Sequence, residues 1–178
     1  VARFQSNGSG RDATIQLSDN VAHSATISML SSALIFKQSG TETLRIDSDG
    51  QIGIGNIAPD TWSTGKGLTI GTSQATLWGV GDQINLSGNA YFNSGWKAAA
   101  TKAGASQIQQ ALGDIDFRVT GSINADAAIT WIDALRITKT GNVGINATNP
   151  NSLLEVRGTA GTYTNGVTVF TGNTTHSG

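Results

Sequence analysis

The sequence has no cysteine, only two prolines and few charged or aromatic residues. These low counts exclude several kinds of functional site and binding partner. Without cysteine, disulfides, thiolate metal sites and cysteine nucleophiles are excluded. Charged residues make up 13% of the chain and the net charge is −1. No basic stripe indicates nucleic-acid binding, and no apolar run approaches the roughly 18 residues that span a bilayer. We therefore expect no nucleic-acid partner, no membrane insertion and no cofactor.

Glycine is abundant, with 23 residues, and apolar residues mostly alternate with polar ones over short runs. This alternation favours half-buried strands, and the Gly and Asn clusters between them favour tight turns. The fold class predicted is all-β. The expected strands are 13–17, 25–29, 43–47, 67–70, 115–119, 134–138 and 166–170. Residues 95–112 contain alanines that permit a helix, but Gly104 and the absence of an apolar stripe favour strand and loop.

One segment of the chain occurs twice. Residues 44–59 align without gaps on residues 135–150, at a constant offset of 91 positions, since 135 − 44 = 91. The two prolines of the chain, Pro59 and Pro150, occupy equivalent positions in this alignment. A second comparison, of 34–37 with 115–118, has an offset of 81, so the second copy has about ten extra residues, near 122–131. We predict a first repeat over 1–66, a longer second repeat over 67–157 and the start of a third over 158–178, in a piece of a longer chain.

The repeated motif has an apolar and a solvated side. Leu44 and Ile46 alternate with polar neighbours, and Gly50 fits a hairpin turn. Gly53 lies within a short apolar run, where a glycine usually marks close backbone approach, which chains packed around a common axis would require. Each unit has too few apolar residues for a core of its own. We expect the unit to bury surface against copies of itself, in a number that the residues alone leave open.

The motif carries a family resemblance. Leu135-Arg136-Ile137, Gly141-Asn142-Val143-Gly144-Ile145, Pro150 and Leu154-Glu155-Val156 resemble a signature widespread in phage tail fibres and related virion appendages. Asn146 departs from it, because a glycine is usual there. The structural motif residues implied are Leu44, Arg45, Ile46, Gly50, Gly53, Ile54 and Pro59 in the first copy, and Leu135, Arg136, Ile137, Gly141, Gly144, Ile145 and Pro150 in the second.

The resemblance implies an elongated, intertwined homotrimeric fibre on the outside of a virion, with short antiparallel strands and Gly/Asn turns. The implied function is structural, as a segment of a tail fibre involved in host attachment, with no enzymatic activity. Its implied partners are identical chains, other virion tail proteins and a host cell-surface glycan. Three alternatives stay open: a polysaccharide-degrading tailspike, a capsid-decorating head fibre or cement protein, and a bacterial adhesin.

Few residues suggest chemistry. Asp47-Ser48-Asp49-Gly50 resembles the start of a calcium loop, but no downstream Glu follows, so we expect a turn and no metal. Asp114 and Asp116 share a strand face and, with Asp126 and Asp133, are the carboxylates that glycan cleavage would use. His23 and His176 lack partners at catalytic spacing. A tryptophan in such a chain more commonly packs in a core shared between chains; of the four, Trp62 and Trp131 lie in connecting segments and are the better candidates for glycan contact.

Overall fold

The computed structural model describes residues 13–19, 23–55, 62–71 and 75–158. Its first strands are β1 (Ala13–Ser18), β2 (Ser24–Leu30), β3 (Ala33–Gln38), β4 (Thr41–Ile46) and β5 (Ile52–Ile54). Next along the chain are β6 (Lys66–Ile70), β7 (Ala75–Val80), β8 (Gln83–Gly88), β9 (Ala90–Phe92) and β10 (Trp96–Ala98). The last are β11 (Ala105–Ala111), β12 (Asp114–Thr120), β13 (Ile132–Ile137), β14 (Val143–Ile145) and β15 (Leu154–Val156).

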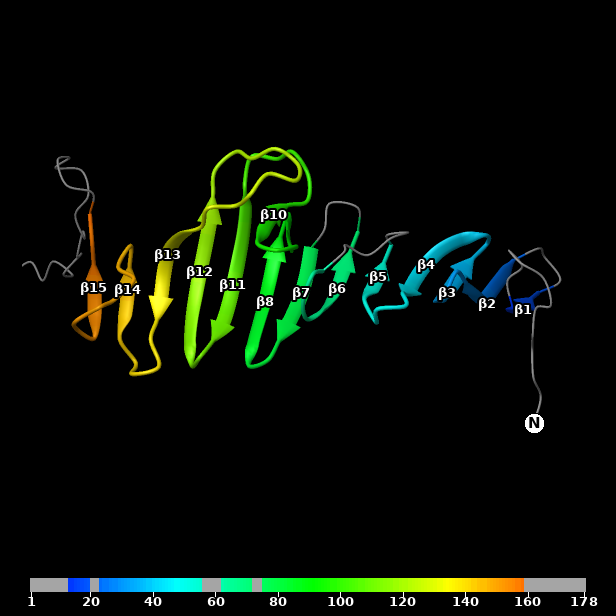
Figure 1. The fold of residues 1–178 in the computed structure, drawn as a ribbon, viewed down its shortest axis with the longest axis horizontal. Helices are drawn as coiled ribbons and strands as arrows, with labels where there is room; N and C mark the ends of the chain where they lie inside the picture. Colours follow the sequence, from blue (N-terminus) through cyan, green and yellow to red (C-terminus); the bar gives the residue numbers. More distant parts are fainter. Residues whose placement is uncertain (1–12, 20–22, 56–61, 72–74, 159–178) are drawn as a thin grey trace, which may run out of the picture.

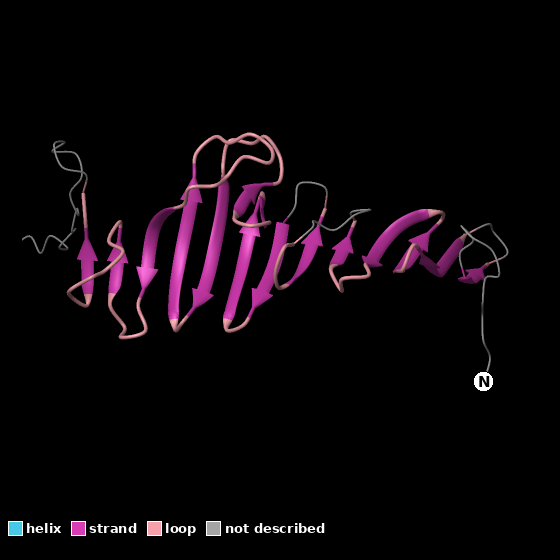
Figure 2. Cartoon of the chain, in the orientation of Figure 1, coloured by secondary structure: helices cyan, strands magenta, loops and turns pink. Residues whose placement is uncertain are grey.

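Thirteen strands form one sheet in chain order, interrupted only because β8 pairs directly with β11. Figure 1 shows them side by side, from β1 at one side of the picture to β15 at the other. The remaining two, β9 and β10, form a separate small sheet. No described residue is helical (Figure 2), so the all-β prediction is confirmed, including the preference for strand and loop over 95–112. It follows that none of the described segments is a helix able to cross a bilayer.

Most strand pairs are antiparallel, as predicted, but two pairs are parallel. The parallel pairs are β5 with β6 and β14 with β15. In each pair, the last strand of a matching segment, β5 or β14, pairs with the next strand of the sheet. Because both strands of a pair run in the same direction, the chain must cross over between them. Six of the seven predicted strands are confirmed. The seventh, 166–170, lies outside the described residues.

The two matching segments pair in the same way. Leu44, Arg45 and Ile46 face Ile54, Gly53 and Ile52, and the residues 91 positions later face one another in the same register. The preceding strand pairs each have an irregularity at the corresponding place, between Phe36 and Lys37 and between Phe117 and Arg118. The extra residues of the second segment lie where the sequence places them, because 121–131 connect β12 to β13 whereas only two residues connect β3 to β4.

The repeated turns explain two of the glycine positions of the motif. Gly50 and Gly141 have φ of +77° and +88°, a conformation that favours glycine. Their N–H groups donate to the carbonyls of Asp47 and Thr138, at 3.1 and 2.8 Å. Asn146, which stands in a glycine position of the resembling signature, has φ of +52°, and asparagine tolerates this region better than most residues.

Gly144 is required by a close approach, but within one chain. A Cβ on Gly144 would collide with the carbonyl oxygen of Ala147, in the segment that leads from β14 to β15. Its side of the sheet is also the buried one. From the sequence, we expected a glycine in this run to allow neighbouring chains to approach closely around an axis. In the structure, the close approach to Gly144 is made within one chain, by the segment that leads from β14 to β15. Pro150 is buried in that segment, and Pro59 lies outside the described residues.

Candidate functional site

One face of the thirteen-stranded sheet is almost entirely apolar. Directly opposed residues share a face of a sheet, so the strand registers trace continuous rows of side chains across it. One such row runs from Met29 through Leu34, Ile46, Ile52, Leu68, Leu77, Leu86 and Ile108 to Phe117. It continues through Leu135 and Ile145 to Val156. We call this surface the apolar face.

The apolar face is exposed. Large side chains on it retain between 37% and 65% of their accessible surface. They are Ile15, Leu17, Ile27, Met29, Ile54, Ile70, Leu77, Ile84, Leu86, Phe117, Val119, Ile132, Ile145, Leu154 and Val156. An apolar surface that extends over so many strands is unusual for a monomeric protein and marks an interaction surface.

The opposite side, the polar face, is the more deeply buried one. Its buried residues include Ser28, Thr69, Thr76, Asn85, Ser87, Gln107, Gln109 and Asp116. Some of them are hydrogen-bonded: the Oγ1 of Thr76 lies 2.6 Å from the Oγ of Ser87 and donates to the carbonyl of Ala90 at 3.1 Å. Others, namely Ser28, Thr69 and Gln107, have no side-chain hydrogen-bond partner among the described residues. The chain thus covers polar residues and leaves apolar ones open, the reverse of an ordinary soluble domain.

Residues 89–104 and 121–131 form a lobe that covers part of the polar face. We call it the covering lobe. The two segments are tied by backbone hydrogen bonds, such as Ala98 N to Ala127 O at 3.0 Å and Ile129 N to Trp96 O at 2.8 Å. At its exposed part, the hydroxyl of Tyr91 donates to Asp126 Oδ1 at 2.7 Å. Figure 1 shows these loops beyond the ends of β11 and β12. The first matching segment has no counterpart of the 121–131 connection.

An aromatic cluster joins the covering lobe to the sheet. Trp96 contacts every other ring of the cluster, with its centroid 6.5 Å from Trp62, 5.5 Å from Trp78 and 5.6 Å from Phe92. Trp78 also stacks on Trp62 at 5.8 Å and on Phe92 at 5.1 Å. Trp131 packs against Trp96 at 6.0 Å. The Trp78 Nε1–H donates to the carbonyl of Thr64 at 2.7 Å. Side chains that are up to 69 positions apart in the sequence, at 62 and 131, therefore form one cluster.

The cluster decides how the two predicted glycan contacts are placed. Trp62 is 6% exposed and stacks on Trp78, so its ring face is occupied within this chain. Trp131 is half-buried at the end of the cluster, and among the described residues its one aromatic neighbour is Trp96. Of the two, only Trp131 retains ring surface that a sugar could contact.

Ion pairs occupy the polar face beside the lobe. Arg118 Nε lies 2.7 Å from Asp133, and Arg136 Nη2 lies 2.6 Å from Asp114. Asp116 lies between the two arginines, at 3.1 and 3.3 Å. Burial raises the pKa of Asp116 despite these arginines, whereas the backbone N–H of Lys139, together with Arg136, lowers the pKa of Asp114. The carboxylates that glycan cleavage would use are thus engaged by arginines, except Asp126, which accepts from Tyr91.

The repeated motif is divided between the two faces. Leu44, Ile46, Ile54, Leu135, Ile137 and Ile145 contribute to the apolar face. Arg45, Gly53, Arg136 and Gly144 lie on the polar face. Arg45 binds Glu42 through two hydrogen bonds, of 2.7 and 2.8 Å. The motif therefore supplies apolar side chains to one face. On the other face its arginines form ion pairs, and Gly144 leaves space for the segment that leads to β15.

Two further places were candidates for chemistry. The Asp47 carboxylate accepts from the backbone N–H groups of Asp49 and Gln51, at 2.9 and 2.8 Å, as expected of a turn. Within the described part of the chain, no group of three or more acidic or histidine side chains could hold a metal ion. His23 lies beside an acidic residue four positions away, with its Nδ1 2.9 Å from Asp19 Oδ2.

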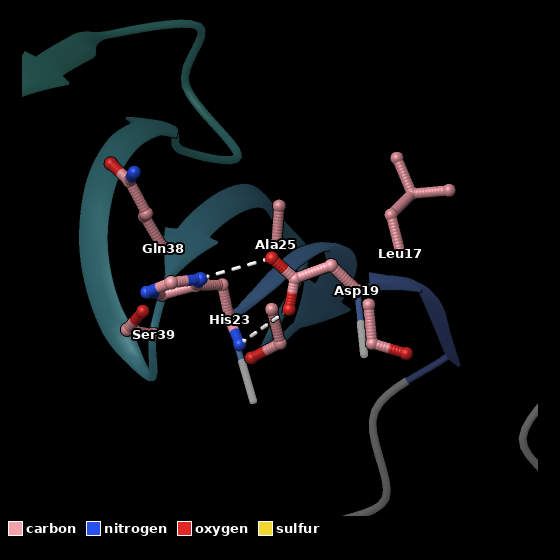
Figure 3. Close-up of a pocket in the computed structure, with 8 residues that line it drawn as sticks. Leu17, Asp19, His23, Ala25, Gln38 and Ser39 are labelled. Atoms are coloured by element: carbon pink, nitrogen blue, oxygen red, sulfur yellow. Dashed lines mark hydrogen bonds and ion pairs between the residues drawn. The ribbon is translucent and has the colours of Figure 1, made fainter. Parts of the chain in front are cut away.

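Figure 3 shows this pair in a hollow of about 320 Å³ near the end of β1. The His23 side chain is 75% exposed, and the two residues are four positions apart. This is the geometry of a surface ion pair, which contributes little to stability. His176 lies outside the described residues.

No family model matches the chain. A search among curated proteins finds no match either. The resemblance of the motif to virion appendages is thus carried by the residues quoted for it alone.

The apolar face is the candidate functional surface, and the sequence pattern indicated it only in part. Alternation in strands such as 43–47 indicated apolar sides, but the register that aligns them across β1 to β15 is set by turns and by two parallel pairs. One feature of the sequence pointed to the covering lobe, namely the extra residues near 122–131. Nothing in the sequence indicated that this connection pairs with 96–102.

Proposed function

We propose that the chain is a structural segment of a virion fibre, a phage tail fibre involved in host attachment, and that its apolar face is the surface by which identical copies assemble. The observation that carries this proposal is the exposed apolar face. The motif that resembles virion appendages supplies the place on the particle and the number of copies, which is three. In this assembly the three apolar faces turn towards a shared axis.

The size of the apolar face supports self-association. Full burial of a Leu, Ile or Phe side chain removes roughly 60–120 Å² from water, from about 1.5–3 kcal/mol at about 25 cal/mol per Å². Fifteen side chains that remain about half exposed then offer about 700 Å² per chain. A stable interface of standard size buries about 800 Å² per partner. The exposed apolar area of one chain is thus comparable to one standard interface, and in a three-chain assembly it is divided between two neighbours.

The arrangement of the faces supports a role in which copies wrap around one another. When the apolar faces are turned inward, the polar face and the covering lobe lie on the outside. The lobe then presents Tyr91, Asp126 and Trp131 to solvent, where a host glycan or another tail protein can reach them. Multiple weak contacts of this kind on one particle sum to useful avidity.

The place on the virion is tested by labelling. Antibodies against residues 75–158 are expected to decorate the tail of the phage particle in electron micrographs and to reduce adsorption to the host. Decoration of the head would instead support a capsid fibre or cement protein. Release of reducing ends from host capsule by the purified chain would favour a tailspike.

A further inference from the structure

The apolar face has a hollow at one end of its strands. The hollow has a volume of about 370 Å³ and lies over β7, β8, β11 and β12. Its floor consists of Ala75, Gly88 and Ser106, which oppose one another in the strand register. Leu86 and Phe117 stand beside it. Three small residues in a row, in a face otherwise built of Leu, Ile and Phe, leave this depression.

The opposite end of the same strands carries a protruding apolar side chain. Counted from strand to strand across the sheet, it lies at the same position as the hollow. Ile84 belongs to β8 and lies opposite Gly79 of β7 and Gln110 of β11. It is 43% exposed. Gly79 has no side chain to cover it. Four residues separate Ile84 from Gly88 along β8, a distance of about 13 Å at about 3.3 Å per residue. Within one chain, Ile84 therefore cannot fill the hollow.

We propose that the hollow receives Ile84 of a neighbouring copy of the chain. The proposal rests on the proposed function, because it requires apolar faces turned towards a common axis with the strands crossing it. In such a ring, one strand end of each copy meets the opposite strand end of the next, as in any head-to-tail cyclic contact. The row of small residues then meets the bulky residue at the same level, and each copy donates one Ile84 and accepts one.

The fit is apolar and directional. The side chains that form the floor and walls on this face, Ala75, Gly88, Ser106, Leu86 and Phe117, carry no charge. Arg118 also lines the hollow, but its guanidinium is engaged by Asp133, with Nε 2.7 Å from the Asp133 carboxylate. Burial of a branched apolar side chain in a matching depression fixes the rotational order of the copies, which a smooth apolar surface would leave open.

A cysteine cross-link tests this contact directly, since the chain has no cysteine of its own. The double variant Ile84→Cys with Ser106→Cys is expected to form covalent oligomers on mild oxidation, at least tenfold more than either single variant. A bond within one chain is excluded, because the two positions are about 13 Å apart and disulfides require Cα atoms within about 7 Å. The matched control pairs Ile84→Cys with Ser122→Cys on the exposed covering lobe and is expected to remain uncross-linked.

Light scattering on the same samples separates the two claims. Samples that are oligomeric but do not cross-link at 84 and 106 would overturn the contact and leave the proposed self-association standing. Monomeric wild-type chain would overturn both. As a second readout, Ser106→Leu, at an exposed position, is expected to fill the hollow and weaken association at least tenfold, whereas Ser106→Ala retains it. Equal association of these two variants would also overturn the contact.

Discussion

Leu86→Glu places a charge at the middle of the apolar face. Leu86 lies on β8 between Leu77 and Ile108, and 55% of its surface is exposed. In a single chain the new carboxylate reaches water, so the substitution loses only the buried half of a leucine, about 1 kcal/mol. In the assembly, three carboxylates would be buried together without cationic partners, at a cost of several kcal/mol each. We therefore expect the fold to persist and the association to be lost.

The assay compares sedimentation velocity with circular dichroism at matched concentrations. A penalty of about 4 kcal/mol weakens association by a factor of about 1,000, which converts an oligomer at micromolar concentration into monomers. The control is Ser122→Glu on the covering lobe, which adds the same charge outside the apolar face and is expected to change neither readout. Normal association of the Leu86→Glu chain would mean that the face is not buried between copies.

Three further substitutions test the internal structure. Trp78→Ala removes a buried ring that contacts three others in the aromatic cluster and is expected to lower the unfolding free energy by about 3–5 kcal/mol, measured by urea titration of tryptophan fluorescence; a loss below about 1 kcal/mol would contradict the cluster's role in holding the lobe. Gly144→Ala is expected to lower the urea midpoint because its Cβ meets the Ala147 carbonyl, whereas Gly121→Ala, with open space around it, should be neutral. The pKa of Asp114 is lowered in the folded chain, so its contribution is present above its ordinary pKa of 3.8 and is lost as pH falls below that value. Asp114→Asn should therefore flatten the acid side of the stability curve, and an unchanged acid limb would count against the contacts of Asp114 with the Lys139 N–H and with Arg136.

Local patterns predicted the strands well because alternation and turn residues act over a few positions. Leu135-Arg136-Ile137 has the pattern of a strand with one apolar side, and the structure pairs it as expected. The constant offset of 91 positions identified two matching segments, and the structure pairs both in the same register. The parallel pairs were missed, because a polar segment that crosses over to pair again has no periodicity of its own.

The aromatic cluster lay beyond the reach of sequence reasoning for a different reason. The sequence placed Trp62 and Trp131 in connecting segments without deciding what packs on them, since nothing local distinguishes a buried tryptophan in a loop from an exposed one. Their burial depends on Trp78 and Trp96, which the strand registers bring between them. The reversed burial of the sheet was also invisible, because the covering lobe is assembled from segments about 30 positions apart.

Native mass spectrometry of the whole chain tests most directly whether the apolar face is covered by identical copies. We predict a dominant species of three times 18.3 kDa at micromolar concentration. A stable, folded species of 18.3 kDa across that concentration range would contradict self-association through the apolar face.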